Sequence, residues 1–158
     1  MRNMVAEETM LTIEAVNQRL PLVRTIVRDI MELSRDIAVR KQRLSSLRER
    51  YPITGGDDSV YEQEVLQMEA ELPRDEVRLD EYVRELHQIG GRLTDAQLGT
   101  VDFPSDMDGE KIWLCWQSDE PEVLCWHRGD CDKNNRVSVY HELSSGGYPA
   151  ENGRQQDA

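Results

Sequence analysis

The feature that most constrains this 158-residue chain is a spacing: two stretches carry apolar residues at steps that alternate between three and four. A period of 3.5 residues is typical of helices that keep one apolar seam against a partner helix, as in a coiled coil or long helical hairpin. Each seam has one charged interruption, Arg40 in the first and Asp75 in the second. The seam positions are Val23, Ile26, Ile30, Leu33, Ile37, Arg40, Leu44, Leu47 and Tyr51, then Tyr61, Val65, Met68, Leu72, Asp75, Leu79, Tyr82, Leu86, Ile89 and Leu93.

The residues before the first seam predict where its helix begins. Thr12 is a candidate N-cap, which favours a short helix over Ile13 to Arg19. Pro21 suits the first turn of a separate helix, because the N–H that proline lacks would have no intrahelical partner there. We therefore expect a long second helix from about Pro21 to Arg50.

The residues between and after the seams predict how the second seam helix is placed. Proline and two glycines in the segment YPITGGDD, residues 51–58, predict a bend, with Asp58 or Ser59 capping the next helix. Pro73 predicts a kink within that helix, because it removes a backbone hydrogen bond. The pair Gly90–Gly91 then predicts its C-terminal end.

An antiparallel hairpin with its bend near residue 56 gives a consistent register that places Arg40 about one turn from Asp75. We hypothesise that this pair fixes the register, because a charge buried without its partner costs several kcal/mol. The alternative is that Arg40 extends to solvent. The predicted cross-seam pairs are Tyr51 with Tyr61, Leu47 with Val65, Leu44 with Met68, Ile37 with Asp75 and Leu33 with Leu79.

The two predicted helices carry opposite charge. From Arg19 to Arg50 the chain has nine basic and four acidic residues, whereas from Asp57 to Glu85 it has eleven acidic and three basic ones. This segregation favours ion pairs between the helices, which would set their orientation. The alternative is two ordinary solvated faces, where each exposed pair contributes about 0 to 1 kcal/mol.

Composition excludes several classes of protein. A net charge of -12 argues against binding nucleic acid, which needs a surplus of Lys and Arg. The sequence has no secretory signal at its start and no run of about 18 apolar residues, so we expect no membrane partner and a cytoplasmic location. Three cysteines without framework spacing favour reduced thiols, although a bridge between two of them stays open.

Beyond Leu93 the pattern becomes extended. The segments 111–117 (KIWLCWQ) and 122–127 (EVLCWH) predict a β-hairpin, and 136–142 (RVSVYHE) predicts a third strand. The expected fold is α+β and mainly α: a long antiparallel helical hairpin followed by a small antiparallel β-hairpin or three-stranded sheet. We expect one domain over residues 1–143, divided into a hairpin (12–93) and a β-rich cap (94–143), and a disordered tail over 144–158.

Short motifs in this second half resemble an uncharacterised bacterial family, domain-of-unknown-function family 2203. They are GTVDFPS (99–105), GEKIWLCW (109–116) and EPEVLCWH (120–127), with LTIEAVNQRLPLV near the N-terminus. The family has no established activity, so the resemblance implies an identity without a mechanism. The residues that match its pattern are Asp95, Gly99, Val101, Asp102, Phe103, Pro104, Gly109, Leu114, Cys115, Trp116, Glu120, Trp126 and His127.

Carboxylates and one histidine gather near the predicted β-hairpin. Asp102, Glu122 and His127 are the candidate ligands of a divalent metal, since hard and borderline cations take carboxylate and imidazole donors. The alternative is structural: Asp102 pins a turn before Pro104, and His127 satisfies a buried hydrogen bond. The spacing of Cys125, His127 and Cys131 lacks the paired C-x2-C pattern of a structural zinc site.

Two hypotheses on function follow. The first is a non-enzymatic interaction module, self-associating as a homodimer or binding another protein, whose cap presents the tryptophans Trp113, Trp116 and Trp126. The second is a metal-dependent hydrolase or small-ligand-binding protein built on Asp102, Glu122 and His127. No cofactor is predicted beyond the divalent metal of the second hypothesis. No phosphate loop or serine-centred elbow is present in the sequence.

Overall fold

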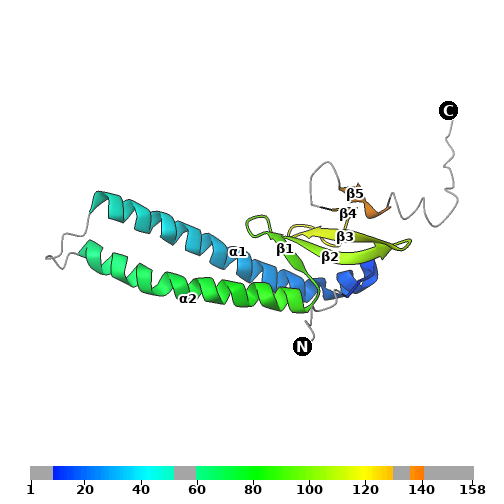
Figure 1. Ribbon diagram of the computed structural model, residues 1–158, viewed down its shortest axis with the longest axis horizontal. Helices are drawn as coiled ribbons and strands as arrows, with labels where there is room; N and C mark the ends of the chain where they lie inside the picture. The colour runs from blue at the N-terminus through cyan, green and yellow to red at the C-terminus, as the bar shows by residue number, and fades with distance from the viewer. Residues whose placement is uncertain (1–8, 52–59, 130–135, 141–158) are drawn as a thin grey trace, which may run out of the picture.

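The computed structural model describes residues 9–51, 60–129 and 136–140. Two long helices form an antiparallel arm, and a small sheet lies across the end of the arm where α1 begins and α2 ends (Figure 1). The α+β, mainly α fold class is thereby confirmed. The elements are α1 (Ile13–Arg50), α2 (Val60–Gln88), β1 (Arg92–Asp95), β2 (Thr100–Met107), β3 (Glu110–Gln117), β4 (Cys125–His127) and β5 (Val137–Ser138).

Helix α1 is one continuous helix of 38 residues, capped by Thr12, whose hydroxyl accepts a hydrogen bond from Ala15 N. The predicted break between a short helix and a second one starting at Pro21 is wrong. Pro21 lies on the exposed side, while Val16, Leu20 and Val23 on either side of it are all buried in the main core. Burying each of these side chains contributes about 1.5–3 kcal/mol, which together exceeds the roughly 3 kcal/mol that an internal proline costs.

Helix α2 also continues through its proline, Pro73, so the two sides of this residue belong to one helix, as expected. It ends in a Schellman motif: Gly91 N donates to Leu86 O, Gly90 N donates to His87 O, and Gly90 takes a φ of +99°. The predicted glycine terminus is thus confirmed. The bend residues 53–58 and the candidate caps Asp58 and Ser59 lie outside the described residues.

The outer half of the arm has its own small core, and the predicted register is confirmed at both ends. The rings of Tyr51 and Tyr61 stack with their centroids 4.2 Å apart. Arg40 Nη2 donates to Asp75 Oδ2 at 2.5 Å, and this hydrogen bond raises the pKa of the guanidinium. The buried residues of this core are Ile37, Leu44, Leu47, Val65, Met68 and Leu72.

Ion pairs join the basic helix to the acidic one, as the charge segregation predicted. Arg40 with Asp75 is the most buried of them, with 19% and 24% of the side-chain surface exposed. The other pairs between the helices are more exposed: Arg40 with Glu71, Lys41 with Glu76, Arg43 with Glu64 and Arg48 with Glu69.

The sheet has five antiparallel strands in the order β1-β2-β3-β4-β5, two more than the largest sheet predicted. β1 and β2 were missed, and Asp102 lies inside strand β2 rather than in a turn before Pro104. Pro104 lies opposite Trp113 of β3, but on its other side β1 pairs only as far as Asp102. Pro104 is tolerated because no strand on the β1 side needs an N–H from it. Instead, the Pro104 carbonyl accepts a hydrogen bond from Leu11 N. The predicted third strand is reduced to β5.

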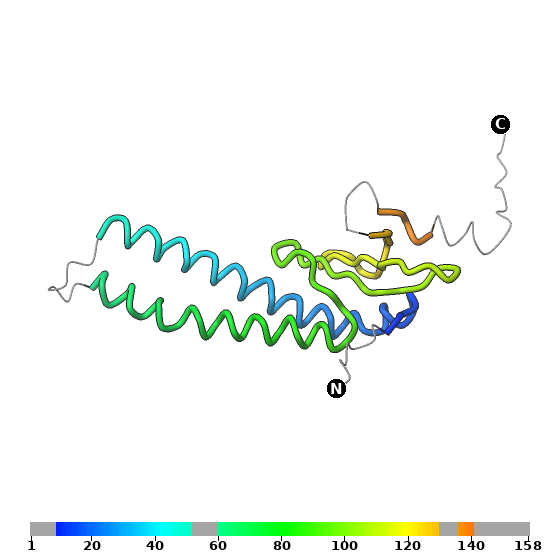
Figure 2. The backbone as a smooth tube through the Cα atoms, in the orientation of Figure 1, coloured from blue at the N-terminus to red at the C-terminus, as the bar shows by residue number. Residues whose placement is uncertain are grey.

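The two faces of the sheet have different surroundings. Val101, Phe103, Leu114, Trp116 and Trp126 belong to the main core, together with apolar residues of α1. Figure 2 shows the sheet lying on one side of the helices, so the alternate residues of the same strands form a second face that points away from them. The predicted tail, 144–158, lies outside the described residues.

Candidate metal centre

Three side chains from neighbouring strands meet on the sheet face that points away from the helices. Asp102 of β2 is the cross-strand partner of Cys115 of β3, and His127 of β4 is the partner of Trp113, two residues before Cys115. Because directly opposed residues point to the same side of a sheet, this register brings the three side chains together. One potential ligand atom from each lies within 4.8 Å of those of the other two, and all three residues are buried.

The hydrogen bonds of His127 fix which ring nitrogen carries the proton. His127 Nδ1 lies 3.0 Å from the carbonyl oxygen of Gly129, and a carbonyl oxygen can only accept, so Nδ1–H is the donor. In the neutral ring, Nε2 is then left with a lone pair. A backbone carbonyl holding the far nitrogen in this way is the usual arrangement around a metal-ligating histidine.

The lone pair of His127 Nε2 faces a carboxylate. Nε2 is 3.1 Å from Asp102 Oδ1, yet within the described part of the chain neither Nε2 nor either oxygen of Asp102 has a partner in hydrogen-bonding geometry. Asp102 also makes no ion pair with a lysine or arginine among those residues. Two acceptors this close in a site without solvent repel each other, so the geometry requires a proton or a metal ion between Nε2 and Oδ1.

The donor set is selective about which metal it would hold. A thiol sulfur and an imidazole nitrogen favour zinc and other transition metals over Mg²⁺ and Ca²⁺, which take oxygen ligands. A tetrahedral zinc ion with bonds of about 2.0–2.3 Å keeps its ligand atoms roughly 3.3–3.8 Å apart. The observed separations, 3.1 Å for Nε2 to Oδ1 and at most 4.8 Å for all pairs, bracket that range.

The structure brings together two of the three predicted metal ligands. Asp102 and His127 belong to the cluster, whereas the carboxylate of Glu122 accepts a hydrogen bond from the Tyr140 hydroxyl. Cys115 takes the third place, whereas it was named from the sequence only as a residue that matches the family pattern. The pairing of residues 101–103 (VDF) with residues 114–116 (LCW) on adjacent strands could have identified Cys115 as a ligand. That pairing involves β2, which was not predicted from the sequence.

Two other acidic residues that match the family pattern have local roles. Asp95 Oδ1 accepts hydrogen bonds from Gln97 N and Leu98 N, which closes the turn after β1. Glu120 is 3.4 Å from Arg136 and largely buried, and this burial raises the pKa of its carboxyl despite the nearby arginine. In the described segments, neither belongs to a cluster of three potential ligands.

The three tryptophans are not displayed to a partner, which corrects the expectation that the cap presents them. Trp116 and Trp126 are 0% and 1% exposed in the main core, and Trp116 Nε1 donates to Glu120 O. Trp113, 9% exposed, lies on the outer face with the cationic groups of Arg92 and Lys111 over its ring. Side chains alternate between the two faces of the sheet along each strand, and residues on both faces are buried here. All three rings are therefore buried, Trp116 and Trp126 on the helix side and Trp113 on the opposite side.

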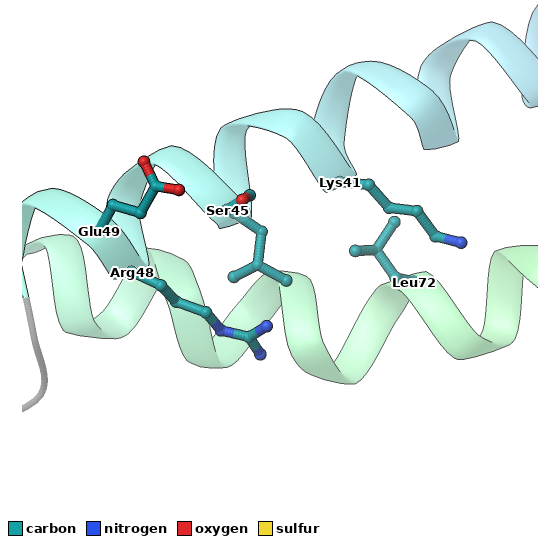
Figure 3. Close-up of a pocket in the computed structure, with 6 residues that line it drawn as sticks. Lys41, Ser45, Arg48, Glu49 and Leu72 are labelled. Atoms are coloured by element: carbon teal, nitrogen blue, oxygen red, sulfur yellow. The ribbon is translucent and has the colours of Figure 1, made fainter.

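The grooves on the surface lie elsewhere. The groove in Figure 3 occupies about 500 Å³ between the helices of the arm, beside Leu44 and Leu72. Both of its cationic groups are already engaged, since Lys41 pairs with Glu76 and Arg48 with Glu69. The other three grooves that we describe are also lined by residues outside the Asp102–Cys115–His127 cluster.

No described helix combines the length and the apolar character needed to span a membrane. The cytoplasmic location stays a prediction.

Comparison with known proteins gives a family but no activity. The sequence matches the family described as uncharacterised conserved protein (DUF2203) over residues 9–139, which includes both helices, the sheet and the cluster. Neither the curated proteins nor the solved structures gave a match. Since the match covers most of its length, the chain belongs to the DUF2203 family.

Proposed function

We propose that this protein binds a divalent transition metal, with Zn²⁺ the best fit, through Asp102, Cys115 and His127. One observation carries the proposal: three potential ligand atoms lie within 4.8 Å of one another in a buried site where the carboxylate and Nε2 lack hydrogen-bonding partners among the described residues. An uncompensated carboxylate in such a place is costly, and a cation removes that cost.

Charge balance supports a divalent ion such as Zn²⁺. Asp102 and a deprotonated Cys115 supply two negative charges, His127 is neutral, and Zn²⁺ makes the total zero. A site with no net charge is the form that burial penalises least. The ion would link β2, β3 and β4, so we propose a structural role in which it holds the sheet together. The described grooves do not reach the cluster, and this favours a structural role over the hydrolytic one.

Cobalt substitution tests this proposal. Protein stripped with a chelator and loaded with Co²⁺ should bind roughly one ion and show a thiolate-to-cobalt charge-transfer band. The band should disappear in Cys115→Ser, and binding should weaken at least about tenfold in His127→Ala. Glu122→Gln is the matched control, since it removes a predicted acidic ligand outside the cluster. Binding without a thiolate band, or equal loss in Glu122→Gln, would overturn the proposal.

A second candidate function is self-association through the arm, favoured by one observation on α2. Leu66, Ala70, Pro73 and Val77 follow at steps of four, three and four, all are exposed, and Leu66 and Val77 are 56% and 58% exposed. Such steps place the four residues on one face of the helix, opposite the seam that contacts α1. We propose that the arm binds a second copy of this chain through this stripe, which forms a homodimer.

Light scattering coupled to size exclusion tests self-association. We expect a dimer at high protein concentration that Leu66→Glu converts to monomer, while the neighbouring Gln67→Glu leaves it unchanged. A monomer at every concentration would refute the homodimer, and a dimer insensitive to Leu66→Glu would move the contact to another surface.

A further inference from the structure

A second thiol lies beside the cluster. Cys125 of β4 is the cross-strand partner of Cys115 of β3, so the two side chains point to the same face of the sheet. Directly opposed residues in antiparallel strands have Cα atoms about 4.5–5.5 Å apart, within the roughly 4.4–6.8 Å that a disulfide spans. The Cβ atoms of such a pair are about 4.5–5.5 Å apart, against about 3.8 Å in a disulfide, so closing the bridge requires a shift of about 1 Å.

The two thiols differ in access to solvent. Cys115 is fully buried, whereas Cys125 is partly exposed and is not disulfide-bonded. The sulfur of Cys115 also cannot bind a metal ion and form a disulfide with the same electron pair. Oxidation of this pair therefore competes directly with the third ligand of the proposed metal site.

From this juxtaposition we infer that Cys115 and Cys125 form a redox modification site, which a peroxide converts to a cross-strand disulfide with release of the metal. The release of metal rests on the proposed function, whereas formation of the disulfide does not depend on it. The chemistry needs two thiols and one peroxide. Because the strands must move together to close it, the bridge is strained and is reduced readily by a dithiol.

The electrons balance in two displacements. The sulfur of Cys125 attacks one peroxide oxygen, the O–O bond breaks, and the products are a sulfenic acid and water. The Cys115 thiolate then leaves the metal and attacks the Cys125 sulfur, and the S–O bond breaks to release hydroxide. Two sulfurs are oxidised, one peroxide is reduced, and the cluster keeps only Asp102 and His127 as ligands.

Full-length protein, zinc-loaded and zinc-free, tests this inference after treatment with hydrogen peroxide and alkylation of the remaining thiols. Trypsin leaves Cys115 and Cys125 in one peptide, residues 112–128, and Cys131 in another, residues 129–133. The predicted bridge therefore lowers the mass of the first peptide by about 2 Da, two hydrogens, without linking it to the second. A chelating dye measures the zinc released, and we expect roughly one zinc per disulfide.

Two variants separate the outcomes. Cys125→Ser should still load zinc and release at least about tenfold less of it, while Cys131→Ser should behave like the natural sequence. Zinc release unchanged in Cys125→Ser, or a bridge that links the two peptides, would overturn the inference. If the protein takes up no zinc when zinc is supplied, yet peroxide still forms a bridge within peptide 112–128, the release step and the proposed function are refuted while the modification site is supported.

Discussion

Removing the ion pair between Arg40 and Asp75 should have unequal and non-additive effects. The two atoms are 2.5 Å apart, and about a fifth of Arg40 and a quarter of Asp75 are exposed. Two unit charges about 4 Å apart interact by about 1 kcal/mol in water and about 4 kcal/mol at an effective dielectric constant of about 20. For a pair that retains part of its solvent contact, we expect a coupling free energy between these two limits, about 2–3 kcal/mol.

The two single replacements differ because Arg40 has another partner. Arg40 Nη2 also lies 2.8 Å from Asp36, so Asp75→Leu leaves the guanidinium paired and should cost about 1 kcal/mol of unfolding free energy. Arg40→Leu leaves Asp75 beside the apolar seam without its arginine, and should cost about 2–3 kcal/mol. The double replacement should return to within about 1 kcal/mol of the original stability, since buried ion pairs are often replaced by apolar residues without loss.

Urea unfolding monitored by circular dichroism measures the four free energies of this cycle. The matched control is the cycle on Arg43 and Glu64, a pair between the same helices with 55% and 33% of the side chains exposed, where the coupling should be smaller and weakened by salt. If the effects of Arg40→Leu and Asp75→Leu add to within about 0.3–0.5 kcal/mol, the pair does not couple and the register argument fails.

Three further predictions concern the sheet. Since burial raises the pKa of Glu120, the folded state binds the proton more tightly than the unfolded state. Stability should therefore fall as pH rises above the unfolded pKa, and Glu120→Gln should flatten this part of a pH–stability curve measured by urea unfolding. Gly99→Ala should cost at least about 1–3 kcal/mol in the same assay, because Gly99 has a φ of +67° and a Cβ would lie 2.6 Å from the sulfur of Met31 and 2.9 Å from Val27. Zinc at about 100 times its dissociation constant should add about 2.7 kcal/mol, seen as a rise in Tm that His127→Ala abolishes.

The sequence located the candidate site but not its full composition. Asp102 and His127 were identified from residue type and from the family resemblance, and both lie in the cluster. Glu122 was chosen because it is close in sequence, whereas its side chain contacts Tyr140. Cys115 was overlooked as a ligand because its position opposite Asp102 follows from the pairing of β2 with β3, which is a contact between strands rather than a local pattern.

The residue pattern alone determined the arm. Apolar residues at steps of three and four predicted two antiparallel helices, their register and the contact of Arg40 with Asp75. They could do so because the helical period is a local property of the sequence, and the partner helix must match it. Tertiary structure decided the rest. Packing on both sides of Pro21 keeps α1 continuous, burial of both sheet faces removes the tryptophans from the surface, and strand register assembles Asp102, Cys115 and His127. These outcomes depend on contacts between segments distant in the chain, whose free energies exceed the local preferences that a sequence displays.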